Sequence, residues 1–226
     1  MNMNKMDRVL LNLGCGAIRP QNWVNTDSSL NSLAQNWPLT RKIGRHLLKS
    51  SVYESSNATF QDLNRKWPWR ENTVDVVYAS HLFEHLRPKI TKLFLSETYR
   101  VLNCQGTIRL VVPDLLQLAK NYITKIGNGD HKASESFLHS VNLHLETSHF
   151  CATKPIFRLI YWLQGYPHQH KYMYDAFSLA DRLQEAKFVD IRQSGYGRSD
   201  YIPEILDVEH GAERTAPAIY LEAKKP

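Results

Sequence analysis

The stretch Val9-Leu10-Leu11-Asn12-Leu13-Gly14-Cys15-Gly16 decides how the rest of the chain is organised. Its first three residues are apolar and predict a short buried strand, which the two glycines then end. Because glycine carries no Cβ, a Gly-x-Gly turn after a strand reverses the chain tightly and lets a ligand approach the bare backbone. A helix that follows such a turn points its free N–H groups at the ligand. The motif is typical of nucleotide-binding sites and also of plain glycine turns in α/β domains.

The length and composition indicate a globular protein with one substantial core. The chain has 226 residues, which suits a single domain over residues 1–226 that carries an insertion. No segment approaches the ~18 apolar residues of a membrane span, and residues 1–7 lack the apolar stretch of a signal peptide. The three cysteines, Cys15, Cys104 and Cys151, lack metal-ligand spacing and favour a reducing, cytoplasmic location. The sequence leaves the oligomeric state open.

The charged residues permit an anionic partner without requiring one. The net charge is +6, but the basic residues are scattered, and the cluster at residues 41–46 is typical of a solvated helix face. The chain lacks a basic tract interleaved with aromatic residues, which binding of single-stranded nucleic acid favours. We therefore expect neither nucleic acid nor a membrane as a partner.

Apolar segments alternate with helical ones through the first half of the chain. Strands are predicted at residues 9–11, 23–27, 58–63, 73–80 and 107–112. Helices are predicted near residues 39–48, at 82–86 and at 90–102, and Gly106 is expected to end the last of these. This alternation favours a parallel sheet with both faces covered.

The alternation stops between residues 114 and 174. Helices are predicted at residues 115–126 and 134–145, and the region is dense in histidine and aromatic residues. We interpret residues 115–174 as a helical insertion packed over the strand ends. A helix at 178–186, a strand at 188–192, a loop at 195–217 and a strand at 218–223 complete the chain.

Five segments resemble, in order and at workable spacing, the motifs of class I S-adenosylmethionine-dependent methyltransferases. They are residues 11–16, Asp27, Asp62-Leu63, residues 79–86, and residues 97–102 with Gly106. The resemblance is to the type 11 methyltransferases, including a subgroup of uncharacterised bacterial members. It implies an α/β fold with a doubly wound, mostly parallel, Rossmann-like sheet of seven strands. The last strand, reached by a long helix-free loop, is expected to insert antiparallel between its neighbours.

The same resemblance implies S-adenosyl-L-methionine as the cofactor. Asp27 is expected to bind the ribose hydroxyls, Asp62 and Leu63 to lie beside the adenine, and the glycine turn to hold the methionine part. The full expected set is Asn12, Leu13, Gly14, Cys15, Gly16, Asp27, Ser28, Asp62, Leu63, Ala79, Ser80 and His81. Asp27 could instead cap a helix, and Asp62 could instead belong to a turn.

Histidines supply the candidate catalytic residues: His81, His85, His144 and His149. His81 follows the fourth strand, where the methyl group and its acceptor should meet, so it is a candidate general base, acceptor-positioning residue or structural residue. Glu84, next to His85, is a weaker candidate. His139, His144 and His149 are spaced by five residues, which spreads them around a helix, so no metal site is expected from them.

Departures from the family pattern narrow the substrate class. Asn12 replaces the usual acid, Ile18 stands at the third glycine position, and residues 103–106 replace the usual Lys-Pro-Gly-Gly turn. No Asn/Asp-Pro-Pro-Tyr motif follows the fourth strand, which disfavours methylation of base or glutamine amino groups. The favoured function is methyl transfer to a small-molecule or saccharide acceptor, with oxygen as the favoured acceptor atom and residues 115–174 as the substrate cap.

Two alternatives remain from the same motifs. A nicotinamide-dependent dehydrogenase shares the strand, glycine turn and helix. However, the third glycine is missing, and Asp27 lies closer than the roughly 20 residues expected of that fingerprint. A non-catalytic binding module could also keep the fold. For the insertion, the aromatic residues could simply pack onto the sheet, rather than line an acceptor pocket with His144, His149 and Tyr172.

Overall fold

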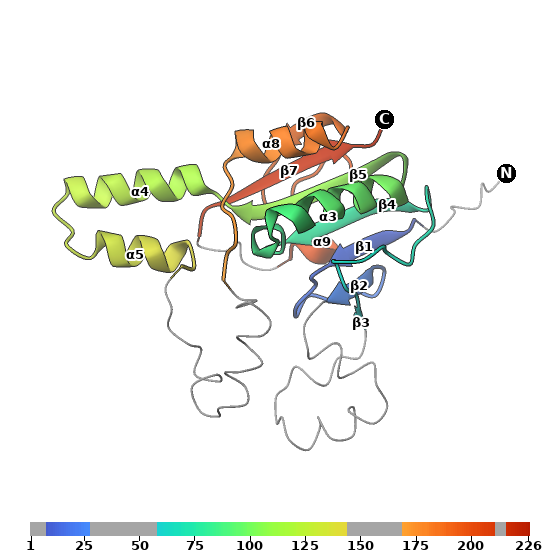
Figure 1. Cartoon of the computed structure of the whole chain (residues 1–226), viewed down its shortest axis with the longest axis horizontal. Coiled ribbons are helices and arrows are strands. Elements are labelled where there is room, and N and C mark those ends of the chain that lie inside the picture. The colour runs from blue at the N-terminus through green and yellow to red at the C-terminus, as the bar shows by residue number, and fades with distance from the viewer. Residues whose placement is uncertain (1–7, 28–57, 144–168, 211–215) are drawn as a thin grey trace, which may run out of the picture.

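A computed structural model describes residues 8–27, 58–143, 169–210 and 216–226. Within these ranges the chain forms a seven-stranded sheet with the order β3-β2-β1-β4-β5-β7-β6 (Figure 1). The strands are β1 Leu10–Leu13, β2 Val24–Asp27, β3 Ala58–Phe60, β4 Val74–Ser80, β5 Leu102–Pro113, β6 Val189–Gln193 and β7 Ala218–Lys224. Strands β1 to β5 pair in parallel, whereas β7 is antiparallel to both β5 and β6. The expected α/β fold and the inserted antiparallel last strand are confirmed.

The described helices lie on both faces of this sheet and beyond its edge. They are η2 Phe83–His85, α3 Pro88–Val101, α4 Leu115–Gly127, α5 Ala133–Ser140, α8 Ala176–Glu185 and α9 Ile205–Val208. Pro88 occupies the first turn of α3, where its missing N–H has no helical acceptor to lose. Asp175 caps α8 in a reciprocal capping box with Ser178.

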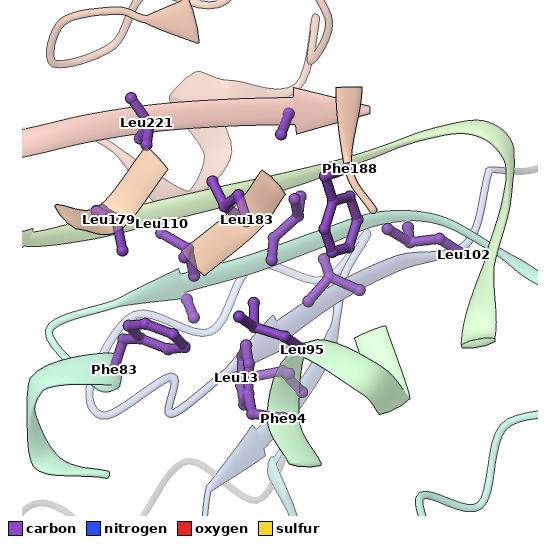
Figure 2. Close-up of a cluster of buried hydrophobic side chains, with 14 of the residues drawn as sticks. Leu13, Phe83, Phe94, Leu95, Leu102, Leu110, Leu179, Leu183, Phe188 and Leu221 are labelled. Carbon is purple, nitrogen blue, oxygen red and sulfur yellow. The ribbon is translucent and has the colours of Figure 1, made fainter. Parts of the chain in front are cut away.

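The larger core lies between the sheet and helices α3 and α8. Phe94 and Leu95 of α3 and Leu179 and Leu183 of α8 pack against strand residues such as Leu13 (Figure 2). Strand β1, most of β4 and the part of β5 from Gly106 onward are buried because both of their faces are covered. The packing fixes the carboxyl ends of these strands relative to one another.

A second, smaller core covers the opposite face. Ile202, Ile205 and Val208 pack there against Trp23 and Tyr78. Ile202, Ile205 and Val208 belong to residues 195–217, which were expected to form a plain loop. This segment contains α9, a single helical turn that is too short to produce a readable apolar period.

Two helix boundaries also differ from expectation. The predicted helix over 82–86 is one 3-10 turn, η2, because Pro88 begins a separate helix two residues later. Gly106 does not end α3: that helix ends at Val101, and β5 begins at the next residue. The pairing of β4 with β5 shifts between Val74 and Val76, so Gly106 lies in an irregular part of β5.

Helices α4 and α5 form the described part of the insertion. They continue from the carboxyl end of β5 as a hairpin that projects beyond the sheet (Figure 1). Much of α4 is exposed, and Ile123 keeps 67% of its surface. His144 and His149 lie outside the described residues, as do Ser28 and the helix predicted near residues 39–48. In the part of the chain that the structure describes, no helix has the length and apolar character needed to cross a bilayer.

Candidate cofactor and acceptor site

The carboxyl ends of β1, β2, β4 and β5 meet at one edge of the sheet. The residues at these ends are Asp27, which ends β2, and Gly14, His81 and Asp114, which follow β1, β4 and β5. In open α/β sheets, ligands bind outside the carboxyl ends of the strands, where the direction of winding changes. Here that change falls between β1 and β4, so the site is expected between the glycine turn and His81.

The glycine turn has the backbone conformation that requires glycine. Gly14 and Gly16 adopt φ angles of +67° and +52°. A Cβ on Gly14 would lie 3.1 Å from the Leu82 side chain, whereas a Cβ on Gly16 would have no atom within 4 Å. The turn therefore packs against the β4 end on one side and leaves open space beside Gly16 on the other.

The contacts of Asn12 explain why an amide stands where the family usually has an acid. It is buried, and its Nδ2 donates to the Ile18 carbonyl at 2.9 Å and to Asn25 Oδ1 at 3.0 Å. Asn25 in turn donates to the carbonyls of Pro20 and Trp23. A carboxylate cannot donate, so the amide is what holds the loop after the glycine turn in place.

Asp27 lies at the end of β2, directly beside the glycine turn. Its Oδ2 accepts a hydrogen bond from Gly16 N at 3.2 Å, and the side chain is partly exposed. A carboxylate in this place can accept hydrogen bonds from vicinal ribose hydroxyls. The open space beside Gly16 and this neighbouring acceptor fit the methionine and ribose parts of S-adenosylmethionine.

Other expected cofactor contacts have their own structural surroundings. Asp62 Oδ1 accepts from the backbone and side chain of Asn64, as turn aspartates do. Leu63 and Ala79 are buried in the larger core, and Ser80 ends β4. Their contacts with a cofactor stay predictions.

Cys15 is a buried thiol within the glycine turn. Burial, with a smaller contribution from the Asp27 carboxylate, raises the pKa of Cys15 to about 11. The thiol is therefore neutral near pH 7 and is not an activated nucleophile.

Three residues after the end of β4 shape the site: His81, Phe83 and Glu84. His81 has a φ of +50°, an uncommon value for a residue with a side chain, and its N–H donates to Val111 O at 2.8 Å. Phe83 is fully buried beside Phe94 (Figure 2), and its ring lies 5.5 Å from that of Phe94 and 5.2 Å from that of Tyr174. This packing anchors η2 to the core and fixes the position of the next residue, Glu84.

Glu84 is the buried centre of a histidine cluster. Its side chain is 0% exposed, and its Oε1 lies 3.3 Å from His81 Nδ1, 4.0 Å from His85 Nε2 and 3.9 Å from His170 Nε2. None of these contacts has hydrogen-bond geometry, so among the described residues neither oxygen of Glu84 has a hydrogen-bond partner. Burial lowers the pKa of His170, which the nearby Glu84 only partly offsets, so His170 is favoured as a neutral imidazole.

The last residues of the insertion are joined to η2. The N–H groups of Lys171 and Tyr172 donate to the Glu84 carbonyl at 2.7 and 3.1 Å, and His85 Nδ1 lies 3.1 Å from Gln169 O. Tyr174 O accepts from Leu115 N at 2.9 Å, which closes the insertion at its base. The segment thus returns to the edge of the sheet where His81 lies.

The structure brings together some of the predicted residues and adds others. Gly14, Gly16 and Asp27 form one group, and His81 and His85 meet at Glu84. Glu84 had only weak support in the sequence, and His170 was not selected from the many histidines of the insertion. No local sequence pattern could bring Glu84 and His170 together, because the two segments are far apart in the chain. His85, next to Glu84, contacts Gln169, which lies 84 positions later.

The chain matches one family model. Residues 11–110 match the model described as "Methyltransferase domain", which runs from β1 into β5. No curated protein matches the chain significantly.

Similar solved structures have low sequence identity to the chain. One is a methyltransferase of Archaeoglobus fulgidus, with 14% identity, coverage of 96% of this chain and 86% of that chain, and a TM-score of 0.46. Another is the protein bound to the Trm112 methyltransferase activator of Haloferax volcanii, with 13% identity, 97% and 83% coverage, and a TM-score of 0.45. A third is phosphoethanolamine N-methyltransferase 2 of Haemonchus contortus, with 13% identity, coverage of 97% of this chain and 49% of that chain, and a TM-score of 0.46.

The assignment rests on the matched residues and on the sheet that contains them. The match covers the glycine turn, Asp27 and the β4 end, which are the parts that meet at one edge of the sheet. Residues 11–110 therefore match a methyltransferase domain of the class I S-adenosylmethionine-dependent type, whose cofactor is S-adenosyl-L-methionine.

Proposed function

We propose that this methyltransferase transfers the methyl group to a hydroxyl oxygen of a small-molecule or saccharide acceptor. The observation that carries the proposal is the contact between His81, at the carboxyl end of β4, and the buried Glu84. A hydroxyl must lose its proton as it is methylated, and a histidine beside a carboxylate, which stabilises the protonated imidazole, is a suitable proton acceptor.

The cofactor is proposed to bind across the glycine turn. Gly14 and Gly16 would contact its methionine part through the backbone, and Asp27 would accept hydrogen bonds from its ribose. Bound there, S-adenosylmethionine supplies a methyl group on a positively charged sulfur. His81 then lies on the neighbouring strand end, where it can hold the acceptor hydroxyl and take its proton.

The acceptor is proposed to lie between the β4 end and the returning end of the insertion. Tyr172 is exposed and lies 4.8 Å, ring to ring, from the buried Tyr174. An aromatic side chain with a polar tip provides both an apolar wall and a hydrogen bond, which suits a hydroxylated, partly apolar molecule. His144 and His149 remain candidates for the same pocket from the sequence.

Cofactor binding is tested by calorimetry with S-adenosylmethionine, S-adenosylhomocysteine and NAD. We expect the first two to bind and NAD not to bind. Asp27→Asn should weaken binding by about 1–3 kcal/mol through the lost charge-assisted hydrogen bonds. Asp181→Asn, on the exposed surface of α8, is the control and should bind as the parent does. Unchanged affinity in Asp27→Asn would remove Asp27 from the site.

Acceptor class is tested by transfer of a radiolabelled methyl group to panels of sugars, phenols, amines and thiols. We expect labelled ethers from hydroxyl compounds. His81→Ala should lower kcat by roughly 10²–10⁴-fold while the affinity for S-adenosylmethionine stays unchanged. Transfer only to amines or thiols would overturn the oxygen assignment, and undiminished kcat in His81→Ala would remove the proposed base.

A further inference from the structure

We propose that Glu84, His85 and His170 form a binding site for a transition-metal ion of the zinc type. Two of these residues belong to η2 at the end of β4, and the third comes from the returning end of the insertion. Their ligand atoms, one from each residue, lie within 4.8 Å of one another. The site differs from the histidines at 139, 144 and 149, whose spacing gives no common ligand face.

The first argument is the condition of Glu84. Its carboxylate is completely buried, and within the described ranges neither oxygen receives a hydrogen bond. An ionised carboxylate withdrawn from water requires a cation or several hydrogen bonds to compensate for its lost hydration. The side chains around Oε1 are histidines, so a metal ion held jointly with them would supply the missing positive charge.

The second argument is the orientation of the two imidazoles. His85 Nδ1 lies 3.1 Å from the carbonyl of Gln169, and a carbonyl only accepts, so Nδ1 carries the proton. His170 Nδ1 lies 3.2 Å from the thioether sulfur of Met173, which is also an acceptor. In His85, Nε2 therefore keeps its lone pair. The His170 ring also hydrogen-bonds the Val141 carbonyl, and its Nε2 lies 3.9 Å from Glu84 Oε1. Metal-binding histidines show the arrangement of His85, with the far nitrogen donating to a backbone or side-chain acceptor.

A bound ion would draw the three ligand atoms closer together. Glu84 Oε1 lies 4.0 Å from His85 Nε2 and 3.9 Å from His170 Nε2. In a tetrahedral site with bonds of about 2.0–2.1 Å, ligand atoms lie about 3.4 Å apart. The two carboxylate–imidazole pairs must therefore approach by about half an ångström, and the two imidazole nitrogens, which lie within 4.8 Å of each other, by up to about 1.4 Å.

The ligand types select the metal. Two imidazoles and one carboxylate suit Zn²⁺, Co²⁺, Ni²⁺ or Fe²⁺, whereas Mg²⁺ and Ca²⁺ prefer oxygen ligands alone. Three protein ligands leave one coordination position open, as in catalytic zinc sites. His81 contacts Glu84 but lies outside the ligand group, so it remains available to take a proton.

The open position would bind the acceptor oxygen, a role that rests on the proposed function. A hydroxyl bound to the ion loses its proton more readily, and His81 would receive it. The oxygen then forms a bond to the methyl carbon as the carbon–sulfur bond breaks, and the electron pair of that bond returns to sulfur. The products are the methyl ether, S-adenosylhomocysteine and one proton.

The test uses the full chain without an affinity tag, after removal of metal by a chelator. Zn²⁺ is titrated by calorimetry, and Co²⁺ by its visible absorption. We expect one ion per chain and a Co²⁺ spectrum of low coordination number. Glu84→Gln, His85→Ala and His170→Ala should each weaken affinity at least about tenfold. His131→Ala, an exposed histidine before α5, is the control and should bind as the parent does.

Circular dichroism separates lost binding from lost folding. Glu84→Gln is nearly isosteric, so it is expected to fold even where an alanine variant does not. The proposal is overturned if the metal-free parent shows no stoichiometric binding, or if folded Glu84→Gln binds the ions as tightly as the parent. Methyl transfer that persists in excess chelator would overturn the metal's role alone. Metal binding without transfer to hydroxyls would overturn the proposed acceptor class and leave the metal site standing.

Discussion

Asn12 shows how a single side chain shapes the cofactor edge of the sheet. Its amide donates two hydrogen bonds, to the Ile18 carbonyl and to Asn25 Oδ1, while buried. Asn12→Asp would replace a donor by an acceptor and bring a negative charge against two oxygens. We expect the free energy of unfolding to fall by about 1–3 kcal/mol, measured by urea denaturation.

Asn121→Asp provides the matched control for that change. Asn121 Oδ1 accepts from Gln117 on the exposed side of α4, and an aspartate would still accept there. Its stability should stay within about 0.5 kcal/mol of the parent. Equal losses in the two variants would contradict the role assigned to the Asn12 amide.

The residue scale also shows where sequence reasoning stops. The glycine turn and Asp27 could be predicted because each follows a recognisable strand, and parallel strand ends meet at one edge. Glu84 and Arg109 could not be placed, because a charged residue in an apolar segment is read as exposed unless its partners are known. Those partners are distant: Arg109 binds Glu209, 100 residues later in the chain.

At the scale of elements, Glu97 joins α3 to the loop before β4. Its carboxylate accepts from Trp67 N at 2.7 Å and from Arg100 Nε and Nη2 at 2.9 and 2.6 Å. Hydrogen bonding from Arg100 is the main cause that lowers the pKa of Glu97. Glu97→Gln should therefore lower the free energy of unfolding at pH 7 by about 1.5–3 kcal/mol.

The pH dependence of this loss has a definite sign. A carboxyl whose pKa is lower in the folded state adds stability above its unfolded pKa of about 4.3 and loses it as pH falls through the folded value. The difference between parent and Glu97→Gln should therefore narrow below about pH 4.3. Glu185→Gln removes an equally spaced but exposed partner of Arg182 and should change stability little at any pH. A gap that widens in acid would contradict the assignment.

Gly106 provides a prediction about the irregular start of β5. A Cβ there would lie 2.9 Å from the Asn103 carbonyl oxygen and 3.1 Å from the Leu102 side chain. Because a backbone atom cannot yield easily, Gly106→Ala should lower the free energy of unfolding by about 1–3 kcal/mol. Gly127→Ala, at the end of α4 with no atom within 4 Å, should be neutral or gain up to about 1 kcal/mol. Chemical denaturation measures the free energy of unfolding of both variants. Equal effects would contradict a steric clash between a Cβ at residue 106 and the Asn103 carbonyl oxygen.

At the scale of the whole molecule, the sequence predicted the sheet better than its coverings. Alternating strands and helices indicated a parallel sheet, and the antiparallel β7 followed from the family resemblance and the long loop before it. The segment around α9, which covers the face of the sheet opposite α3 and α8, was not anticipated. Its contacts come from one helical turn and from charged residues, rather than from a periodic apolar face. That segment depends on Arg109.

Arg109 lies on β5, completely buried, and holds three parts of the fold together. Its guanidinium binds Glu209 through Nε at 2.8 Å and Nη2 at 2.7 Å, and Glu222 of β7 through Nη1 at 2.7 Å. Nη1 and Nη2 also donate to the carbonyls of Arg198 and Gly195. The network thus joins β5 to β7 and to the segment that carries α9.

Arg109→Met should lower the free energy of unfolding by about 3–5 kcal/mol, because it leaves two buried carboxylates without their cation. Arg192→Met, at an exposed ion pair, is the control and should change stability by less than about 1 kcal/mol. Replacing Arg109, Glu209 and Glu222 together by methionine removes the unpaired charges, so the triple variant should be more stable than Arg109→Met alone. Urea denaturation measures all three. A triple variant less stable than the single one would show that hydrogen bonds from the two glutamates, rather than unpaired charge, hold the second face in place.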